Sequence, residues 1–126
     1  MAAKVRTEFL VAVPHKPGAL AGVLESLAKA GINVLAFCGW GEGEGAKILV
    51  VPDKDDKARK VLTGATESRV LCVTTASGKG AGGKLAAKLG TAGINVEHAY
   101  ATTSGSGQGT AVFRTADPDA ALKALK

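Results

Sequence analysis

The sequence predicts an α+β protein built from two copies of one β-α-β-β-α unit. The residues Gly-Ile-Asn-Val at positions 31–34 recur at positions 93–96, an offset of 62 residues. In both copies, an apolar segment typical of a strand precedes the three- and four-residue apolar spacing of a helix. Each copy then holds two apolar runs separated by a glycine-rich stretch, as expected for a hairpin. We interpret this pattern as an internal duplication, with copies at residues 1–66 and 67–126.

The junction between the first strand and the first helix, residues 11–20 (VAVPHKPGAL), organises the first copy. Before it, alternation predicts a strand with one buried face, formed by Val5, Thr7, Phe9, Val11 and Val13. After it, the apolar stripe of a helix is formed by Leu20, Val23, Leu24 and Leu27. Gly18 lets a ligand approach the backbone closely, and the first turn of the helix presents free N–H groups. These main-chain groups predict an anion site.

The same patterns predict five elements in each copy. In the first copy we expect a strand at about 4–13, a helix at about 18–30, strands at about 32–40 and 46–52 around a turn at 41–45, and a helix at about 54–63. In the second copy we expect a strand at about 68–76, a helix at about 80–92, strands at about 94–103 and 109–115, and a helix at about 117–125. Right-handed crossovers then place both helices on one face of an antiparallel sheet, the ferredoxin-like pattern. The second copy lacks the fourth strand, so we expect a second chain or the other copy to cover that edge.

Composition narrows the class of protein. The chain has 126 residues, 46% of them hydrophobic and 21% charged, which describes a folded protein of one ordinary or two very small domains. No apolar run is long enough for a membrane helix and no signal peptide is visible, so we expect a cytoplasmic protein without a membrane partner. The net charge of +5 comes from scattered lysines, without the aromatic pattern of RNA-binding strands, so no nucleic-acid partner is expected. Cys38 and Cys72 lie in no metal or disulfide motif, and no metal or cofactor is predicted.

The residues PHKPGAL at 14–20, LAKAGINV at 27–34, the glycine hairpin and the second helix introduced by VPD resemble the ACT domain family. The resemblance covers the whole chain and implies two ferredoxin-like ACT-type repeats packed side by side. It also implies a tandem regulatory protein of amino-acid metabolism that binds a small molecule, an amino acid above all, between modules. A homodimer and a metabolic enzyme or regulator as partner follow from the same resemblance.

The resemblance also implies the ligand contacts. One wall is the loop after the first strand, here His15, Lys16, Gly18, Ala19 and Leu20, with Gly80 at the position of Gly18 in the second copy. The facing wall is the second strand of another module, here Asn95, Val96 and Glu97, or the equivalent Asn33, Val34 and Leu35. Helix N–H groups suit a carboxylate, and an Asn amide offers both a donor and an acceptor.

The second copy departs from this pattern. Lys79 stands at the position of Pro17, and Gly82 at that of Leu20, so the loop loses stiffness and its helix loses an apolar anchor. We therefore expect its site to be altered or lost. Residues 78–84 (GKGAGGK) match the GxxxxGK phosphate-loop pattern, but Leu85 replaces the hydroxyl residue that holds Mg²⁺. Some anion beside Lys79 and Lys84 remains an open alternative.

Two other classes of function remain open. A small enzyme on the same scaffold, of acylphosphatase type, needs a loop arginine, which residues 14–19 lack, and no catalytic grouping of residues stands out. The acidic residues at the second helix of each copy are explained by capping and the helix dipole: Asp53, Asp55, Asp56, Asp117 and Asp119. The second alternative is a structural interaction module with vestigial pockets. We expect a non-catalytic protein.

Overall fold

The computed structural model describes residues 1–126 and confirms all of the predicted helices and strands. In chain order they are β1 (Ala2–Pro14), α1 (Ala19–Lys29), β2 (Val34–Glu42), β3 (Gly45–Pro52), α2 (Asp55–Val61), β4 (Thr66–Ala76), α3 (Ala81–Thr91), β5 (Val96–Thr103), β6 (Gln108–Thr115) and α4 (Pro118–Leu125). None of the helices has the length and hydrophobicity needed to cross a membrane.

The chain forms two compact units. The first unit is Thr7–Ser68, and the second unit combines Met1–Arg6 with Arg69–Lys126. Strands β1 and β4 therefore contribute residues to both units. The division of the duplicated copies at residues 1–66 and 67–126 stays a prediction.

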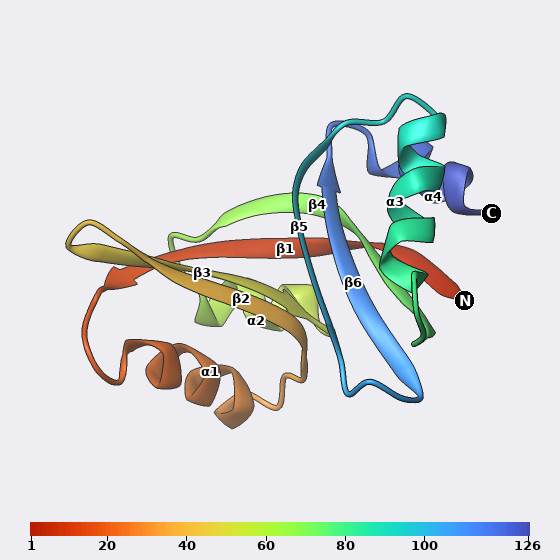
Figure 1. Ribbon diagram of the computed structural model, residues 1–126. Coiled ribbons are helices and arrows are strands. Elements are labelled where there is room, and N and C mark those ends of the chain that lie inside the picture. The colour runs from red at the N-terminus through yellow and green to blue at the C-terminus, as the bar shows by residue number, and fades with distance from the viewer. The chain divides into compact units, whose positions relative to one another are not determined.

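The first unit has the strand order β2-β3-β1-β4, in which β3 pairs antiparallel with both β1 and β2. In Figure 1, α1 and α2 lie on the same side of these strands. Their shared core contains Phe9 of β1, Leu27 of α1, Val50 of β3 and Ala58 of α2, each at most 1% exposed. The alternation predicted for the first strand is confirmed here, because Phe9 has Val11 and Val13 beside it on this face.

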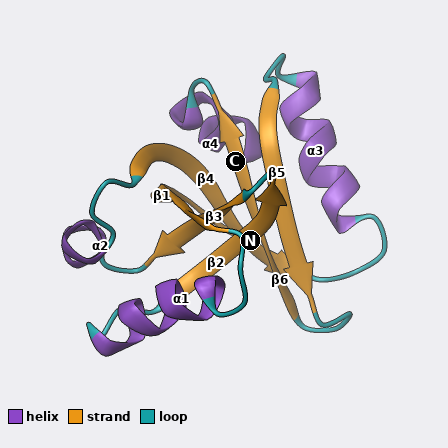
Figure 2. Ribbon diagram, turned by 90° about the vertical axis from the view of Figure 1, so that its left-hand side faces the viewer, coloured by secondary structure: helices purple, strands orange, loops and turns teal.

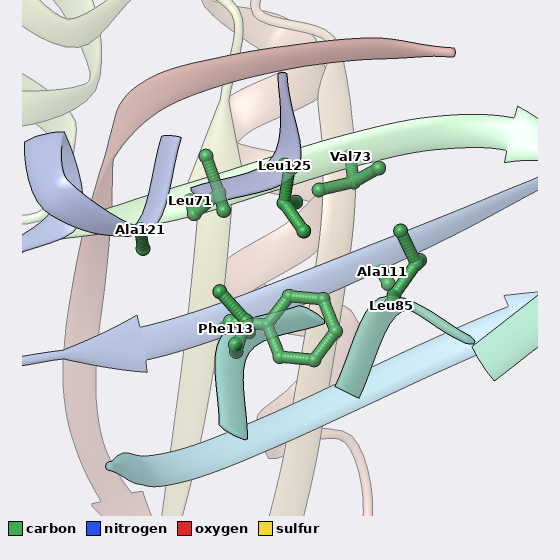
Figure 3. Close-up of a cluster of buried hydrophobic side chains, with 8 residues drawn as sticks. Leu71, Val73, Leu85, Ala111, Phe113, Ala121 and Leu125 are labelled. Carbon is green, nitrogen blue, oxygen red and sulfur yellow. The ribbon is translucent and has the colours of Figure 1, made fainter. Parts of the chain in front are cut away.

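The second unit has the strand order β5-β6-β4-β1, with β6 antiparallel to both β4 and β5. In Figure 1, α3 and α4 lie together beside β4 and β6. Figure 3 shows their core, in which Leu85 of α3 and Leu125 of α4 pack with Leu71 of β4 and Phe113 of β6. The position beside β4 that the second copy cannot fill is taken by β1. We expected either a second chain or the other copy to cover this edge, and in the structure a strand of the other copy covers it.

Buried side chains also lie on the faces of the strands that point away from the helices. Val51 of β3, Val70 of β4 and Val112 of β6 are fully buried, although their neighbours in the strand supply the helix-facing cores. The continuous apolar runs at 48–51 and 70–73 are typical of strands that are buried on both faces. Glu8 of β1 is also buried, at 1% exposed, and the sequence pattern did not predict a buried carboxylate in this strand.

Candidate functional site

A cleft of about 300 Å³ lies in the first unit, between the β1–α1 loop and the β2–β3 hairpin. We call it the first cleft. Its walls come from four segments of the chain: Val13, Pro14, His15, Lys16, Ala19, Leu20, Phe37, Gly39, Trp40, Gly41, Ala46, Lys47 and Ile48. No carboxylate lines it, so its charged side chains are basic.

The first cleft exists because β2 carries glycine where other residues would fill the space beneath α1. Strand pairing places Phe37 opposite Val50, Gly39 opposite Ile48 and Gly41 opposite Ala46. Val50 and Ile48 belong to the helix-facing core, so both glycines lie on that same face. Without their side chains, the strand leaves a hollow at the N-terminal end of α1, which lies beside β2 in Figure 2.

The imidazole of His15 closes one end of this hollow. A Cβ atom on Gly41 would overlap this ring, with both ring nitrogens only 2.8 Å away. The backbone N–H of His15 also donates to the backbone carbonyl of Glu44 in the hairpin turn, at 3.2 Å. These contacts fasten the β1–α1 loop to the hairpin, so the loop is positioned before any ligand arrives.

A second cleft of about 470 Å³ lies at the corresponding place in the second unit. Its walls are Thr75, Ala76, Ser77, Gly78, Ala81, Gly82, Leu85, Ala101, Thr102, Thr103, Gly109, Thr110 and Ala111. The loop is again fastened to the hairpin, since the Ser77 and Thr103 hydroxyls lie 2.6 Å apart and the Ser77 N–H donates to the Gly107 carbonyl at 2.7 Å. Ser77 and Thr103 stand at the repeat positions of His15 and Gly41, so the contact is kept with different residues.

The second cleft is larger because a smaller residue lines it on the helix side. Gly82 of α3 stands at the position of Leu20 of α1, and Leu20 is 42% exposed beside the first cleft. We expected an altered second site from this substitution, and the missing side chain at position 82 widens the space.

The helices that open on the clefts differ from the other two at their N-termini. Helices α1 and α3 begin after Gly18 and Gly80, both with positive φ, and neither has a side-chain cap or an acidic residue in its first turn. In contrast, α2 and α4 carry acidic residues in their first turns, and Asp117 accepts the Ala120 N–H at 3.1 Å. Uncapped first-turn N–H groups favour an anion. Both clefts therefore receive the electropositive end of a helix.

The expected capping of α2 needs correction, although that of α4 is confirmed. Lys54 is the N-cap residue of α2 and makes no side-chain cap. Asp53 instead accepts the Asn33 N–H at 2.9 Å, and Asp55 accepts the Thr7 hydroxyl at 2.8 Å. These carboxylates are occupied by strand and loop residues of the first unit.

The structure brings some of the predicted contacts together within each unit and separates others. His15, Lys16, Ala19 and Leu20 line the first cleft, and Gly18 and Gly80 are the N-cap residues of the helices above the clefts. The remaining predicted contacts lie at the opposite ends of β2 and β5 from the cleft of their own unit: Asn33, Val34, Leu35, Asn95, Val96 and Glu97. Glu97 forms an ion pair with Arg114 at 3.1 Å. Their expected role facing another module stays a prediction.

Other residues of the clefts were not predicted from the sequence. Phe37, Trp40 and Gly41 line the first cleft, and Thr103 lines the second. The alternate small residues at 39 and 41, and at 99 and 101, are a signal for a hollow strand face. The ion pair of Arg59 with Glu67, at 2.7 Å, lines neither cleft, and hydrogen bonding to Arg59 lowers the pKa of Glu67.

Comparisons with known proteins support the fold. No protein-family model matches the chain, and no curated protein does. The solved structure of protein BT0572 from Bacteroides thetaiotaomicron superimposes with a TM-score of 0.84 at 24% identity, over 98% of this chain and 88% of that chain. The regulatory subunit of aspartate kinase from Thermus thermophilus gives 0.71 at 19% identity, over 99% and 95%. The corresponding subunit from Thermus flavus gives 0.65 at 20%, over 98% and 93%. The chain thus has the α+β fold of two ferredoxin-like repeats, which it shares with regulatory domains of aspartate kinases.

Proposed function

We propose that this chain is a non-catalytic regulatory protein of ACT type that binds a small carboxylate, above all an amino acid. The observation that carries the proposal is the repeated geometry of the two clefts. Each cleft lies beneath a helix without a side-chain cap or an acidic first turn, while α2 and α4 carry acidic first turns. The Ala19 and Ala81 N–H groups already donate to the Lys16 and Gly78 carbonyls, at 3.3 and 3.2 Å. A carboxylate at the N-terminal end of α1 or α3 supplies an acceptor for the N–H groups that follow them in the first turn.

The rest of each cleft suits the remainder of an amino acid. Val13, Leu20 and Phe37 offer apolar surface in the first cleft, and Thr75 offers a hydroxyl in the second. Volumes of about 300 and 470 Å³ fall in the range of small-molecule sites. The wider second cleft takes a larger or more polar ligand than the first.

The interface between modules is the second part of the proposal. Residues 33–35 and 95–97 are distant from the cleft of their own unit, so they take part where they face the loop of another module. We propose a homodimer that supplies this arrangement, with ligand binding favouring one assembly state. Phe37 and Trp40, which are 48% and 42% exposed on the outer strand β2, provide apolar surface for such a contact.

A metabolic enzyme or regulator in the cytoplasm responds to the liganded state in this proposal. The alternatives are an acylphosphatase-like enzyme and a structural module with vestigial pockets. The first is disfavoured because neither cleft is lined by an arginine, the residue that such an enzyme uses to hold a phosphoryl group. The second predicts that no small molecule stabilises the protein.

A thermal-unfolding panel of the twenty amino acids tests the proposal. A ligand at about one hundred times its Kd adds about 2.7 kcal/mol to the free energy of unfolding. We expect at least one amino acid to stabilise the protein, and His15→Ala to weaken that effect. Asn33→Ala weakens it only if β2 faces another module. Sedimentation with and without the active amino acid measures the assembly state.

A panel without any stabilising amino acid contradicts the proposal and favours the structural module. Stabilisation that is unchanged in both variants places the ligand elsewhere on the chain. Phosphatase activity towards acyl phosphates supports the enzyme instead.

A further inference from the structure

A groove of about 380 Å³ in the second unit carries three lysines and no acidic residue. We call it the lysine groove. It is lined by Met1, Thr75, Ala76, Gly78, Lys79, Ala81, Lys84, Leu85 and Lys88. Lys84 and Lys88 lie one helical turn apart on α3, and Lys79 lies in the loop before that helix.

No ion pair joins any of the three lysines to a carboxylate, whereas Lys47 pairs with Glu42, Arg69 with Asp119 and Arg114 with Glu97. Like charges four residues apart on a helix repel each other, and a shared groove adds to this repulsion. The groove therefore concentrates positive charge that no group of the protein neutralises.

This charge belongs to the second copy alone. The repeat places Pro17, Gly22 and Ser26 at the positions of Lys79, Lys84 and Lys88. The duplicated fold therefore forms without the lysines, because the first unit builds the same elements with uncharged residues. Folding does not explain why the second copy has them.

The lysine groove is continuous with the second cleft. Thr75, Ala76, Gly78, Ala81 and Leu85 line both. One molecule can therefore place an anionic group among the lysines and its remaining part in the cleft beside Thr103 and Thr110.

We propose that the lysine groove binds the phosphate group of a small phosphate monoester, whose remaining part lies in the second cleft. The second half of this inference rests on the proposed function, because it takes the cleft as a ligand site. A monoester carries a charge of about −1.5 to −2 near neutral pH and three acceptor oxygens, which matches three ammonium groups better than a carboxylate does.

The loop that supplies these residues has the GxxxxGK pattern at 78–84. The next residue, Leu85, is 7% exposed and packs in the core of the second unit. Because no hydroxyl stands there for Mg²⁺, this loop does not form the metal-nucleotide site of a hydrolase. Binding of the phosphate group, without its transfer, is what the lysine groove supports.

Nuclear magnetic resonance titration of the full chain with inorganic phosphate, O-phospho-L-serine, glycerol 3-phosphate and L-serine tests this inference. The test variant is Lys79→Gln/Lys84→Gln/Lys88→Gln. The control is Lys29→Gln/Lys57→Gln/Lys60→Gln, which removes the same charge from exposed positions on α1 and α2. Both variants retain the fold because all six side chains are exposed, and thermal unfolding checks this.

We expect phosphate to shift the amide signals of residues 78–88 and at least one ester to bind more tightly than phosphate. The test variant weakens the binding of phosphate and of the ester by about tenfold or more, because it removes three cations from the groove, whereas the control variant does not. Absence of phosphate shifts, or equal losses in both variants, overturns the lysine groove as a phosphate site. Esters that bind no better than phosphate overturn the assignment of the cleft to the rest of the molecule.

The outcome is separable from that of the proposed function. If no amino acid stabilises the protein but phosphate binding depends on the three lysines, the lysine groove stands and the amino-acid proposal fails. If L-serine or another amino acid binds equally to the wild type and to the test variant while phosphate does not bind, the amino-acid proposal stands and the lysine groove fails as a phosphate site.

Discussion

The imidazole of His15 lies against the backbone of Gly41, in the space that a side chain at position 41 would occupy. In the second unit, the Ser77 and Thr103 hydroxyls meet at 2.6 Å at the same two positions. The pair of a large loop residue and a strand glycine, His15 and Gly41, therefore has the same role as the pair of small hydroxyl residues, Ser77 and Thr103. Both arrangements fasten the loop that opens the helix above a cleft.

Gly41→Ala tests this relationship. We expect the new Cβ to displace the His15 ring, which is exposed and free to rotate away, so the protein folds and its stability changes by less than about 1 kcal/mol. Ligand affinity of the first cleft falls about tenfold because the loop is released from the hairpin. Calorimetric titration with an amino acid found in the panel measures this loss.

The double variant His15→Ser/Gly41→Thr is the matched control for Gly41→Ala, because it copies the pair of the second unit. We expect it to restore loop fastening and to recover most of the affinity. Equal losses in the single and the double variant contradict a role for this contact, since they show that the His15 ring itself binds the ligand.

Gly82→Leu narrows the second cleft in our second prediction. Nothing lies within 4 Å of a Cβ atom at Gly82, and Leu20 occupies the repeat position in the first unit. Replacing a helical glycine stabilises the protein by up to about 1 kcal/mol, while the added side chain takes up space in the second cleft and weakens ligand binding there. Thermal unfolding and titration of the second-unit amide signals measure the two effects.

Gly83→Leu provides the comparison for Gly82→Leu. It lies one residue further along α3, has the same free space and lines neither the second cleft nor the lysine groove. We expect Gly83→Leu to gain the same helical stability as Gly82→Leu and to keep the wild-type affinity for the ligand. Loss of binding in both variants shows that helix stiffness, not the volume of the cleft, controls binding.

The sequence predicted every helix and strand because the apolar residues of both copies recur with a period of two in the strands and of about 3.6 in the helices. Strands β2 and β5 start at Val34 and Val96, two residues later than the expected starts at about 32 and about 94. The backbone there finishes the preceding helix, since the Ile32 N–H donates to the Leu27 carbonyl at 3.0 Å. Gly41 was expected in a turn but pairs with Ala46 inside β2.

The candidate site was predictable where its residues are contiguous. Residues 15–20 follow one another in the loop, so their convergence on the first cleft needs no tertiary information. Phe37, Gly39 and Gly41 reach the cleft through the register of β2 with β3, which a single sequence does not state. The lysine groove depends likewise on the helical phase of Lys84 and Lys88 beside a loop.

The third prediction concerns Cys72 and alkaline pH. Burial raises the pKa of the Cys72 thiol, and the nearby Arg6 opposes this to a smaller extent. The folded protein therefore holds the neutral thiol more tightly than the unfolded chain does, so this contribution to stability is lost as the pH rises above the ordinary thiol value. We expect the free energy of unfolding to fall between about pH 8 and pH 10 more steeply in the wild type than in Cys72→Ala.

Chemical denaturation across that pH range measures the difference in slope. Arg6→Gln raises the pKa of the Cys72 thiol further and steepens the fall, because the thiolate loses its neighbouring cation. An identical slope in the wild type and in Cys72→Ala contradicts the prediction.

The last prediction concerns the hydroxyl of Thr115 at the end of β6. The residue is 5% exposed, and Oγ1 has no hydrogen-bond partner. Burying an unsatisfied hydroxyl destabilises the folded state by about 1–3 kcal/mol, and valine has the same shape and favours a strand. Thr115→Val therefore raises the free energy of unfolding by about 1 kcal/mol, measured by denaturant unfolding. Thr74→Val on β4, where the side chain is half-buried, stays close to the wild type. A loss of stability in Thr115→Val shows that the hydroxyl is bonded, through a water molecule or otherwise, and contradicts the prediction.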